Sequence, residues 1–423
     1  MTVAAILAAL FALLLIGVPV AFALGLLGLG MLGLGGFSPL MAPQAVLSTL
    51  DGFILLSVPL FLRMSNVLLR GGVGRDLFSA VQAWVGHWPG GLAVATVISC
   101  GLFAAISGSS VATAATIGTV AIPEMVARGY PRRFVYGLLA AGGTLGILIP
   151  PSIPMIVYGF VTEESVIALF LAGIGPGIAL LVLFSGYAMV HSMLTGMGRS
   201  PRMPWPERWR TTARALPSLA LAALVVAGIY SGAFTPTEAA AIGFAAAVLI
   251  TAVVLRSLTW AGFRAAAMDS MATTVAILLI IAGAKVFGKA ITLYRIPQEL
   301  SAFISDVVAT PALFVLLVGA ILVVMGLVLE ALSMVLIMTP VLVPAAMAMG
   351  FDPIWFGVVM VIMVEAALIT PPVGLNLYVI QSVARSTLGD VARGALPFLL
   401  LMFLCVLLLY LFPDLALYIP FKL

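Results

Sequence analysis

Apolar residues form long continuous runs along this chain, and polar residues are confined to short segments between them. A helix that crosses a bilayer needs about 20 apolar residues, and its backbone groups must be bonded within the helix. The pattern therefore predicts spanning α-helices over residues 3–34, 50–69, 134–160, 165–195, 215–232, 236–255, 271–293, 354–380 and 396–418. The first run is long and rich in glycine, so it has room for a break.

Two further apolar stretches contain a short polar segment at their centre. Residues 92–127 contain Ser107-Gly108-Ser109-Ser110, and residues 311–349 contain Glu330-Ala331-Leu332-Ser333. Each arm has about 15 residues, or about 22 Å of helix, which is short for a crossing. Length alone leaves two interpretations open, namely a helical hairpin that enters and leaves on one side, or two ordinary spans with a polar kink.

The charges of the flanking loops favour the hairpins. Basic residues flank the first stretch on both sides, namely Arg70, Arg75, Arg128, Arg132 and Arg133. Mostly acidic residues flank the second, namely Arg295, Glu299, Asp306 and Asp352. Because basic loops stay in the cytoplasm, the first hairpin is predicted to enter from the cytoplasm and the second from outside. The N-terminus is then cytoplasmic and the C-terminus periplasmic.

The composition excludes several classes of protein. Hydrophobic residues make up 63% of the 423 residues and charged residues only 8%, whereas soluble domains carry about 25% charged residues. The net charge of +4 comes from arginines in short loops, which orient a membrane protein and do not indicate nucleic-acid binding. Cys100 and Cys405 lie in apolar runs without metal-ligand spacing. The sequence offers neither a nucleophile–base set nor a Walker A motif, so we expect no enzyme and no ATPase.

The two halves of the chain resemble each other. Residues 143–155 read GTLGILIPPSIPM and residues 364–376 read VEAALITPPVGLN. Aligning the two Pro-Pro pairs also aligns Ser109 with Glu330, so the two short polar segments coincide. Together with the opposite loop charges, this similarity indicates an inverted-topology repeat. Membrane proteins built from inverted repeats are commonly transporters, and these bind their substrates near the midplane at the repeat interface.

The Pro-Pro pairs predict a break in each of two helices. Proline lacks an amide donor and disfavours a helical residue before it, so Pro150-Pro151 and Pro371-Pro372 must interrupt their helices. Broken backbone at membrane depth persists only where it faces protein or a cavity. The freed carbonyls are ligands for a hard cation, and the helix N-termini favour an anion. Each half then supplies a tip and a break for one cation, with an anionic substrate between the halves.

Four segments resemble a known family. They are FAAISGSSVATAATIG (103–118), GTLGILIPPSIPMIVYG (143–159), MTPVLVPAA (338–346) and LITPPVGLNLYV (368–379). They are similar to the large M subunit, of the DctM type, of tripartite ATP-independent periplasmic (TRAP) transporters, and the resemblance extends over essentially the whole chain. It departs at Ala366-Ala367, where the family often carries a glycine.

The resemblance implies an all-α polytopic inner-membrane protein with the ion-transporter-superfamily fold. That fold has an inverted repeat, two re-entrant helical hairpins, two broken helices and an elevator-type transport domain. The resemblance also implies Na⁺ as the coupling ion, without an organic cofactor. The implied partners are a small four-helix membrane subunit (Q), a periplasmic substrate-binding protein (P) and a small organic anion, besides membrane lipid.

On this basis we divide the chain into five parts. Scaffold helices occupy 1–70, and a basic cytoplasmic loop with further scaffold helices occupies 196–270. The two halves of the transport domain are 71–195 and 271–395, and 396–423 forms a C-terminal helix.

The tips and breaks supply the candidate ligands. One sodium ion is expected at Ser107, Gly108, Ser110, Gly143 and Pro150, and the other at Gly326, Ala367, Thr370 and Val373, mostly through carbonyls. The expected substrate contacts are Ser109, Thr144, Ser152, Gly374 and Asn376.

Ionisable residues deep in apolar sequence are further candidates. Glu330, beside Ser333 at the second tip, is expected to stabilise the tip, to face a cation or to cap a helix. Glu365 is interpreted mainly as structural. A rival hypothesis is a transporter of the same superfamily that works alone and couples to sodium or to protons, in which case Glu330 and Glu365 would carry the protons.

Other charged and aromatic residues fit the membrane surface. Lys285 and Lys289 lie one turn apart, and snorkelling or subunit contact is favoured over substrate attraction. Tryptophans spaced four residues apart are interpreted as an interfacial belt, namely Trp84, Trp88, Trp205 and Trp209. Residues 75–88 and 257–269 are predicted to be amphipathic helices along the inner surface.

Overall fold

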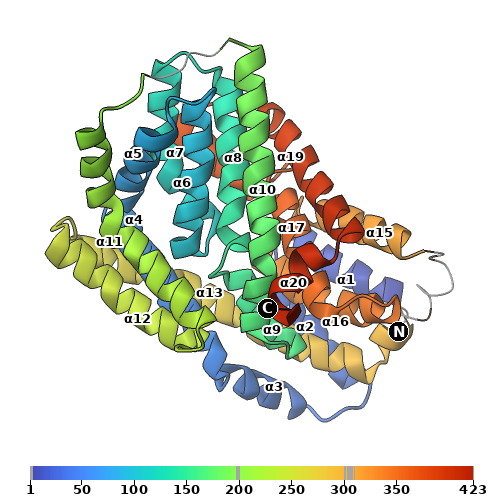
Figure 1. Cartoon of the computed structure of the whole chain (residues 1–423). Helices are drawn as coiled ribbons and strands as arrows, with labels where there is room; N and C mark the ends of the chain where they lie inside the picture. Colours follow the sequence, from blue (N-terminus) through green and yellow to red (C-terminus); the bar gives the residue numbers. More distant parts are fainter. Residues whose placement is uncertain (1–2, 197–200, 300–301, 303–307, 309, 423) are drawn as a thin grey trace.

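The computed structural model of this chain is all-helical over the residues that it describes (Figure 1). These are residues 3–196, 201–299, 302, 308 and 310–422. Within them, eight helices are long and apolar enough to cross a membrane, or nine if one bent pair counts as a single span. The predicted all-α polytopic fold is confirmed. Asp306, part of the loop-charge argument, lies outside the described residues.

The first half contains a hairpin followed by an interrupted helix. Helices α6 (Gly91–Ser107) and α7 (Ser110–Ala127) pack against each other on either side of a two-residue turn. Helix α8 (Arg132–Leu148) is followed after a bend of 41° by α9 (Ile153–Thr162). The long helix α10 (Val166–Leu194) then runs beside α6 and α8.

The second half repeats this order. Helices α15 (Pro311–Met325) and α16 (Ala331–Ala348) form the second hairpin. Helices α17 (Pro353–Leu368) and α18 (Leu375–Ala384) are the two parts of the second interrupted helix. Helix α19 (Leu388–Leu411) and the short α20 (Asp414–Lys422) close the chain, with Phe412 and Pro413 between them, where one helix over 396–418 was predicted.

Local sequence explains the turns. Gly108 has φ 61°, a left-handed conformation that glycine adopts without cost, and the Ser109 side chain then caps α7 by accepting from the Ala112 amide. Ser152 caps α9 in the same way. The peptide bonds Pro150–Pro151 and Pro371–Pro372 are both cis, and the helices stop at them as predicted.

The length argument for the hairpins was wrong for two of the arms. Helices α7 and α16 have 18 residues each, long enough to cross a membrane by length and composition. Each second arm begins inside the polar segment, at Ser110 and at Ala331, and is therefore longer than predicted. The hairpins are instead identified by their paired arms and by the position of their tips inside the molecule.

The remaining helices form a second group. They are α1 (Val3–Leu15), α2 (Val20–Leu34), α3 (Met41–Leu50), the 3-10 turn η1 (Phe53–Leu56), α4 (Ser57–Arg70), α5 (Val73–Val85), α11 (Trp205–Tyr230), α12 (Pro236–Leu249), the π-turn η2 (Ile250–Val254) and α13 (Trp260–Leu293). Helix α13 packs against α2, α3 and α4, and α12 against α4 and α11. Helix α5 joins the two groups, since it packs against both α11 and α6. The apolar run 3–34 is broken at Gly17 and Pro19. In contrast, the predicted boundary between 257–269 and 271–293 does not exist, since α13 is continuous.

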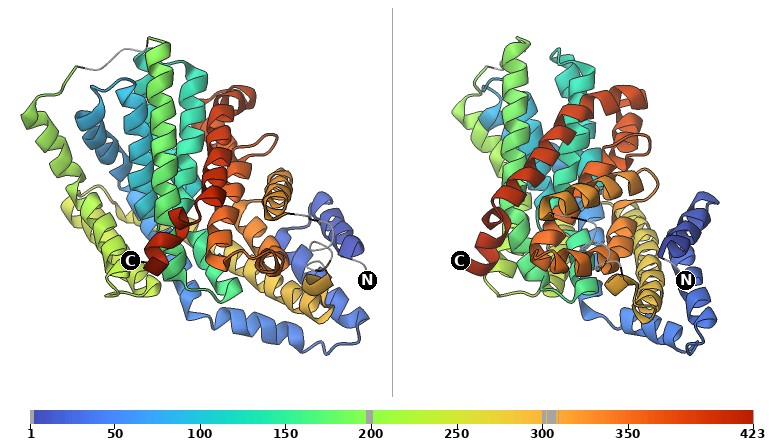
Figure 2. Two further views of the ribbon diagram at one scale, coloured as in Figure 1. Left: turned by 45° about the vertical axis from the view of Figure 1, so that its right-hand side comes forward. Right: turned by 90° about the vertical axis from the view of Figure 1, so that its right-hand side faces the viewer.

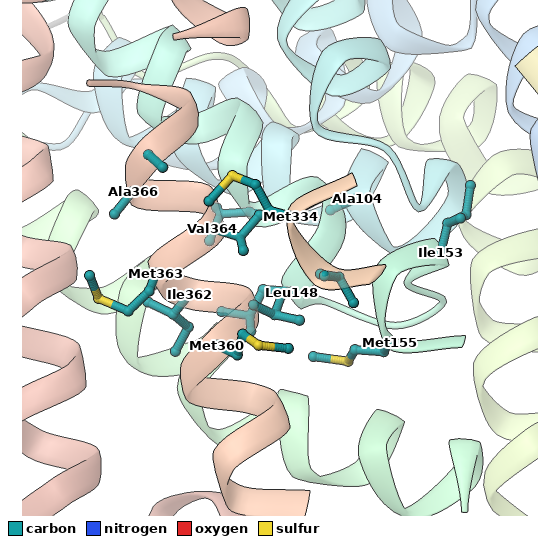
Figure 3. Packing of buried hydrophobic residues seen from close by; sticks show 14 of the residues in the cluster. Ala104, Leu148, Ile153, Met155, Met334, Met360, Ile362, Met363, Val364 and Ala366 are labelled. Carbon is teal, nitrogen blue, oxygen red and sulfur yellow. The ribbon is translucent and has the colours of Figure 1, made fainter. Parts of the chain in front are cut away.

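The two halves meet in a buried apolar core. Figure 3 shows side chains from both interrupted helices and from the second hairpin in one cluster, including Leu148, Met155, Met334 and Met360, all buried. Helices α8 and α19 lie side by side (Figure 2). They approach closely because Gly137 lies against Gly394. Polar contacts add to this packing, as Tyr158 Oη donates to the Pro353 carbonyl (2.6 Å) and Trp355 Nε1 to the Leu409 carbonyl (3.1 Å). The interrupted helices therefore pack within one continuous buried core.

Candidate transport site

A central cavity of about 390 Å³ lies where both hairpin tips face the second group of helices. One wall contains the first tip at Gly108–Ser110 and the second tip at Glu330–Leu332. The opposite wall is a stripe of α4 and two positions of α13, namely Leu62, Ser65, Asn66, Leu69, Thr273 and Ile277. The spacing of the α4 residues is that of one helix face.

Four helix N-termini open onto this cavity. Its lining includes the first residues of α7, α9, α16 and α18, namely Ser110, Ile153, Ala331 and Leu375. Helix N-termini carry partial positive charge and unpaired amide groups, so they attract an anion. Glu330 is the only ionisable side chain among the described lining residues. Among the described lining residues, the helix N-termini are therefore the source of positive partial charge.

The first tip contacts the first break. Ser107 Oγ lies 2.9 Å from Thr113 Oγ1, and Thr113 Oγ1 donates to the Ser109 carbonyl (2.8 Å). A Cβ at Gly108 would lie 2.6 Å from the Pro151 carbonyl oxygen, and one at Gly143 would lie 3.1 Å from that of Ser110. The expected ligands of the first sodium ion thus come together, because glycines let the backbone of α8 and the tip approach.

The second tip contacts the second break in the same manner. A Cβ at Gly326 would lie 2.2 Å from Cβ of Ala367, so one of the two alanines at which the resemblance departs faces a glycine. Thr370 Oγ1 donates to the Ala366 carbonyl (2.8 Å), and a Cβ at Gly374 would lie 3.0 Å from the Thr370 carbonyl oxygen. At the tip, Ser333 Oγ donates to Glu330 Oε1 (3.1 Å). Three of the four expected ligands of the second sodium ion are therefore close in space.

The expected substrate contacts fall into two groups. Ser109 lines the cavity, whereas Thr144, Ser152, Gly374 and Asn376 are not among the lining residues. Thr144 Oγ1 donates to the Ala141 carbonyl (2.6 Å), and Ser152 Oγ donates to the Ile147 carbonyl. Both hydroxyl groups bond to carbonyl groups of α8, and neither residue is part of the cavity lining in this conformation.

Asn376 joins the two halves in a buried polar cluster. Its Nδ2 donates to Ser110 Oγ (2.5 Å) and to the Ala140 carbonyl (3.3 Å). Glu365, only 1% exposed, faces Ser110, yet neither of its carboxyl oxygens has a partner at hydrogen-bonding distance among the described residues. The cluster connects the N-terminus of α7 to both parts of the second interrupted helix.

Sequence reasoning missed the polar residues on the opposite wall. Ser65 is 2% exposed and its hydroxyl lacks a partner within the described part of the chain, while Asn66 Nδ2 donates to Ser270 Oγ (2.9 Å). Polar side chains inside the apolar run 50–69 were the available signal. They were overlooked because one serine or asparagine is common in a spanning helix.

Lys285 and Lys289 line a separate cavity of about 560 Å³, together with Gln44, Ser48 and Glu163. Lys285 Nζ lies 4.5 Å from the centre of the Phe160 ring, which is a cation–π distance. The lysines therefore do not belong to the lining of the central cavity.

The fold and the cavity define a membrane transporter built from two inverted halves, each with a hairpin and an interrupted helix. A family model described as "Tripartite ATP-independent periplasmic transporter, DctM component" matches residues 7–415. The chain therefore belongs to the DctM component family of the tripartite ATP-independent periplasmic transporters, as the resemblance predicted.

Individual relatives support this assignment. The C4-dicarboxylate TRAP transporter large permease protein DctM of Pseudomonas aeruginosa is 39% identical over 372 residues, 88% of this chain and 87% of that protein. The 2,3-diketo-L-gulonate TRAP transporter large permease protein YiaN of Escherichia coli is 32% identical over 408 residues, 96% of each. These relatives are named as transporter permeases and not as enzymes. The chain is a multi-pass membrane component of a transporter.

A solved structure shares the fold. The crystal structure of the Alcanivorax borkumensis YdaH transporter matches with a TM-score of 0.64 at 16% identity, over 89% of this chain and 88% of that one. At this identity the similarity supports the architecture alone.

Proposed function

We propose that this chain imports a small organic carboxylate into the cytoplasm, coupled to sodium, after a periplasmic binding protein delivers the substrate. The observation that carries the proposal is the central cavity, where four helix N-termini and both hairpin tips face α4 and α13. The names of the relatives above include a C4-dicarboxylate and a sugar-derived keto acid, both carboxylates. We expect the same chemical class here.

Sodium would provide the charge balance that the cavity needs. A carboxylate that approaches Glu330 meets a like charge, which costs free energy at low dielectric. A cation at each tip-and-break contact would offset this repulsion and hold the helix N-termini in place. Ion and substrate then stabilise the same state, so each raises the affinity of the other. For the second ion, the ligands are mainly carbonyls released by the break before Pro371.

The two groups of helices suggest the moving parts. The hairpins pack against the interrupted helices, whereas α2, α4, α12 and α13 pack mainly against one another. Residues of α4 and α13 line the cavity opposite the two tips. We propose that the first group is the mobile transport domain and the second the scaffold, which gives an elevator-type movement. Residues 271–293, which we assigned to the transport domain from the sequence, then belong to the scaffold because they are part of the continuous helix α13. A small four-helix subunit would extend the scaffold, and the N-terminus would lie in the cytoplasm.

The test is uptake into proteoliposomes that contain this chain and its small subunit, with C4-dicarboxylate and keto-acid substrates. We expect uptake to require both an inward sodium gradient and the binding protein, and to fall when Ser107 and Ser110 are replaced by alanine. Uptake without the binding protein, or driven by a proton gradient, would instead support the stand-alone transporter. Glu330 and Glu365 would then be the first residues to replace.

A further inference from the structure

A buried arginine without an acidic partner lies where α5 meets the start of α11. Arg208 is 7% exposed, and its Nε has no hydrogen-bond partner among the described residues. The ion pairs between described residues do not include it. Of the nearby acids, Glu207 pairs with Arg210 (2.7 Å), and Asp76 interacts with Arg75 and Arg214. A buried guanidinium normally needs an anion.

Tryptophan rings hold this arginine in place. The guanidinium carbon of Arg208 lies 5.6 Å from the centre of the Trp84 ring and 5.3 Å from that of Trp205. Trp84 Nε1 donates to Thr212 Oγ1 (2.9 Å), and Thr212 Oγ1 donates to the Arg208 carbonyl (2.8 Å). Trp209 packs edge-on against Trp84 at 5.8 Å. The Arg208 side chain is therefore held by contacts from both α5 and α11.

The side chains around Arg208 include both basic groups and apolar rings. Trp205 and Trp209 are largely exposed, as are the basic side chains of Arg202, Arg210 and Arg214. Desolvation and the positive charges of Arg202 and Arg208 lower the pKa of His87. Exposed tryptophans and arginines beside a spanning helix are typical of the level of lipid headgroups.

We propose that Arg208, between Trp84 and Trp205, binds the phosphate of an anionic phospholipid headgroup at the membrane surface formed by α5 and the basic segment 201–214. The planar guanidinium donates to phosphate oxygens, and the indole rings limit its hydration. The exposed rings of Trp205 and Trp209 contact the lipid glycerol and upper acyl chain. The lipid thereby fastens the start of α11 to α5. This site is separate from the transport cavity and does not depend on sodium coupling.

The test measures the thermal unfolding midpoint of the purified full chain in detergent with added phosphatidylglycerol, phosphatidylcholine or inorganic phosphate. We expect phosphatidylglycerol to raise the midpoint by about 2 °C or more, because a ligand of the native state stabilises it. The shift should disappear in Arg208→Gln, persist in part in Arg208→Lys, and remain in Arg210→Gln, whose arginine is exposed and already paired.

Three outcomes would overturn the proposal. They are an equal shift with phosphatidylcholine, an equal shift with inorganic phosphate, and a shift that Arg208→Gln retains in full. A second measurement does not depend on the folding of Arg208→Gln: native mass spectrometry of the unchanged chain with an equal mixture of the two lipids. Retention of phosphatidylglycerol over phosphatidylcholine supports the site, and equal retention contradicts it.

Discussion

The side chain of Asn376, in the second half of the repeat, donates hydrogen bonds to two residues of the first half. The sequence predicts this residue as a substrate contact because it follows the second break. In the structure its Nδ2 is occupied by Ser110 Oγ and the Ala140 carbonyl. Its position on the first turn of α18 therefore sets the distance between the second break and the first tip.

The contact between Asn376 and Ser110 can be tested by a double-mutant cycle. Replacing either residue by alanine removes the same hydrogen bond, so the free energies of unfolding should be non-additive by about 1 kcal/mol. The measurement is unfolding in sodium-free detergent, so that ion binding does not contribute. Thr116 lies on the same helix, and its hydroxyl donates to the Ala112 carbonyl of that helix (2.6 Å). The cycle Asn376→Ala with Thr116→Ala should therefore be additive, and additivity in both cycles would contradict the proposed link.

Ser65 provides a test of the cavity wall. Its hydroxyl is buried and unpartnered within the described structure and faces the space between the tips and α4. If a substrate hydrogen-bonds there, Ser65→Ala should raise KM for uptake by about fivefold, the equivalent of one modest hydrogen bond, with little loss of stability. Ser218→Ala is the matched control, since that serine is also buried and unpartnered but lies away from the cavity. Equal KM values for both variants would remove Ser65 from the site.

At the scale of elements, close helix crossings depend on glycine. A Cβ at Gly137 of α8 would lie only 1.9 Å from the Gly394 carbonyl oxygen of α19. Contacts of this kind let helix backbones approach in a membrane, where apolar side chains alone give little driving force. The two halves are held at their present spacing partly by this crossing.

Gly137→Ala should therefore destabilise the protein by about 2 kcal/mol or more, because neither backbone can move without disturbing the core. Gly186→Ala in α10 is the control, since a Cβ there would meet nothing within 4 Å. It should be neutral or stabilise by about 0.5–1 kcal/mol, as expected for alanine in place of a helical glycine. The readout is the unfolding midpoint in detergent, and a Gly137→Ala variant as stable as Gly186→Ala would refute the argument.

The elements that sequence reasoning placed well are those with a local chemical cause. The serine–glycine turn at 107–110 and the two Pro-Pro pairs interrupt helices for local reasons, so the first tip and both breaks could be predicted. The second tip has no such turn and was located through its polar segment and its alignment with the first. The continuity of α13 could not, because Asp269 and the polar positions before it are also typical of a surface helix, and only packing against α2 and α4 decides the matter. The contact between Trp84 and Arg208 could not be predicted either, because no local sequence pattern connects residues so far apart in the chain.

For the whole molecule, the cavity separates two packed groups, and an elevator requires these groups to slide past each other. Ser65 of α4 and Leu332 of the second tip line the same cavity from opposite walls. In contrast, α7 and α18 pack together within the first group, where a Cβ at Gly118 would lie 3.8 Å from a methyl carbon of Val383. Cross-links at these two places should have opposite consequences.

A cysteine pair at Ser65 and Leu332, introduced after Cys100 and Cys405 are replaced by alanine, should stop uptake when a short bifunctional thiol reagent joins it. Uptake should return when a cleavable linker is reduced, because the link itself prevents the transport domain from moving. A pair at Gly118 and Val383 should leave uptake largely unchanged after cross-linking, since both residues would move together. Continued uptake with the first pair fully cross-linked would show that α4 and the second tip do not separate during transport. The division into scaffold and transport domain proposed here would then have to be redrawn.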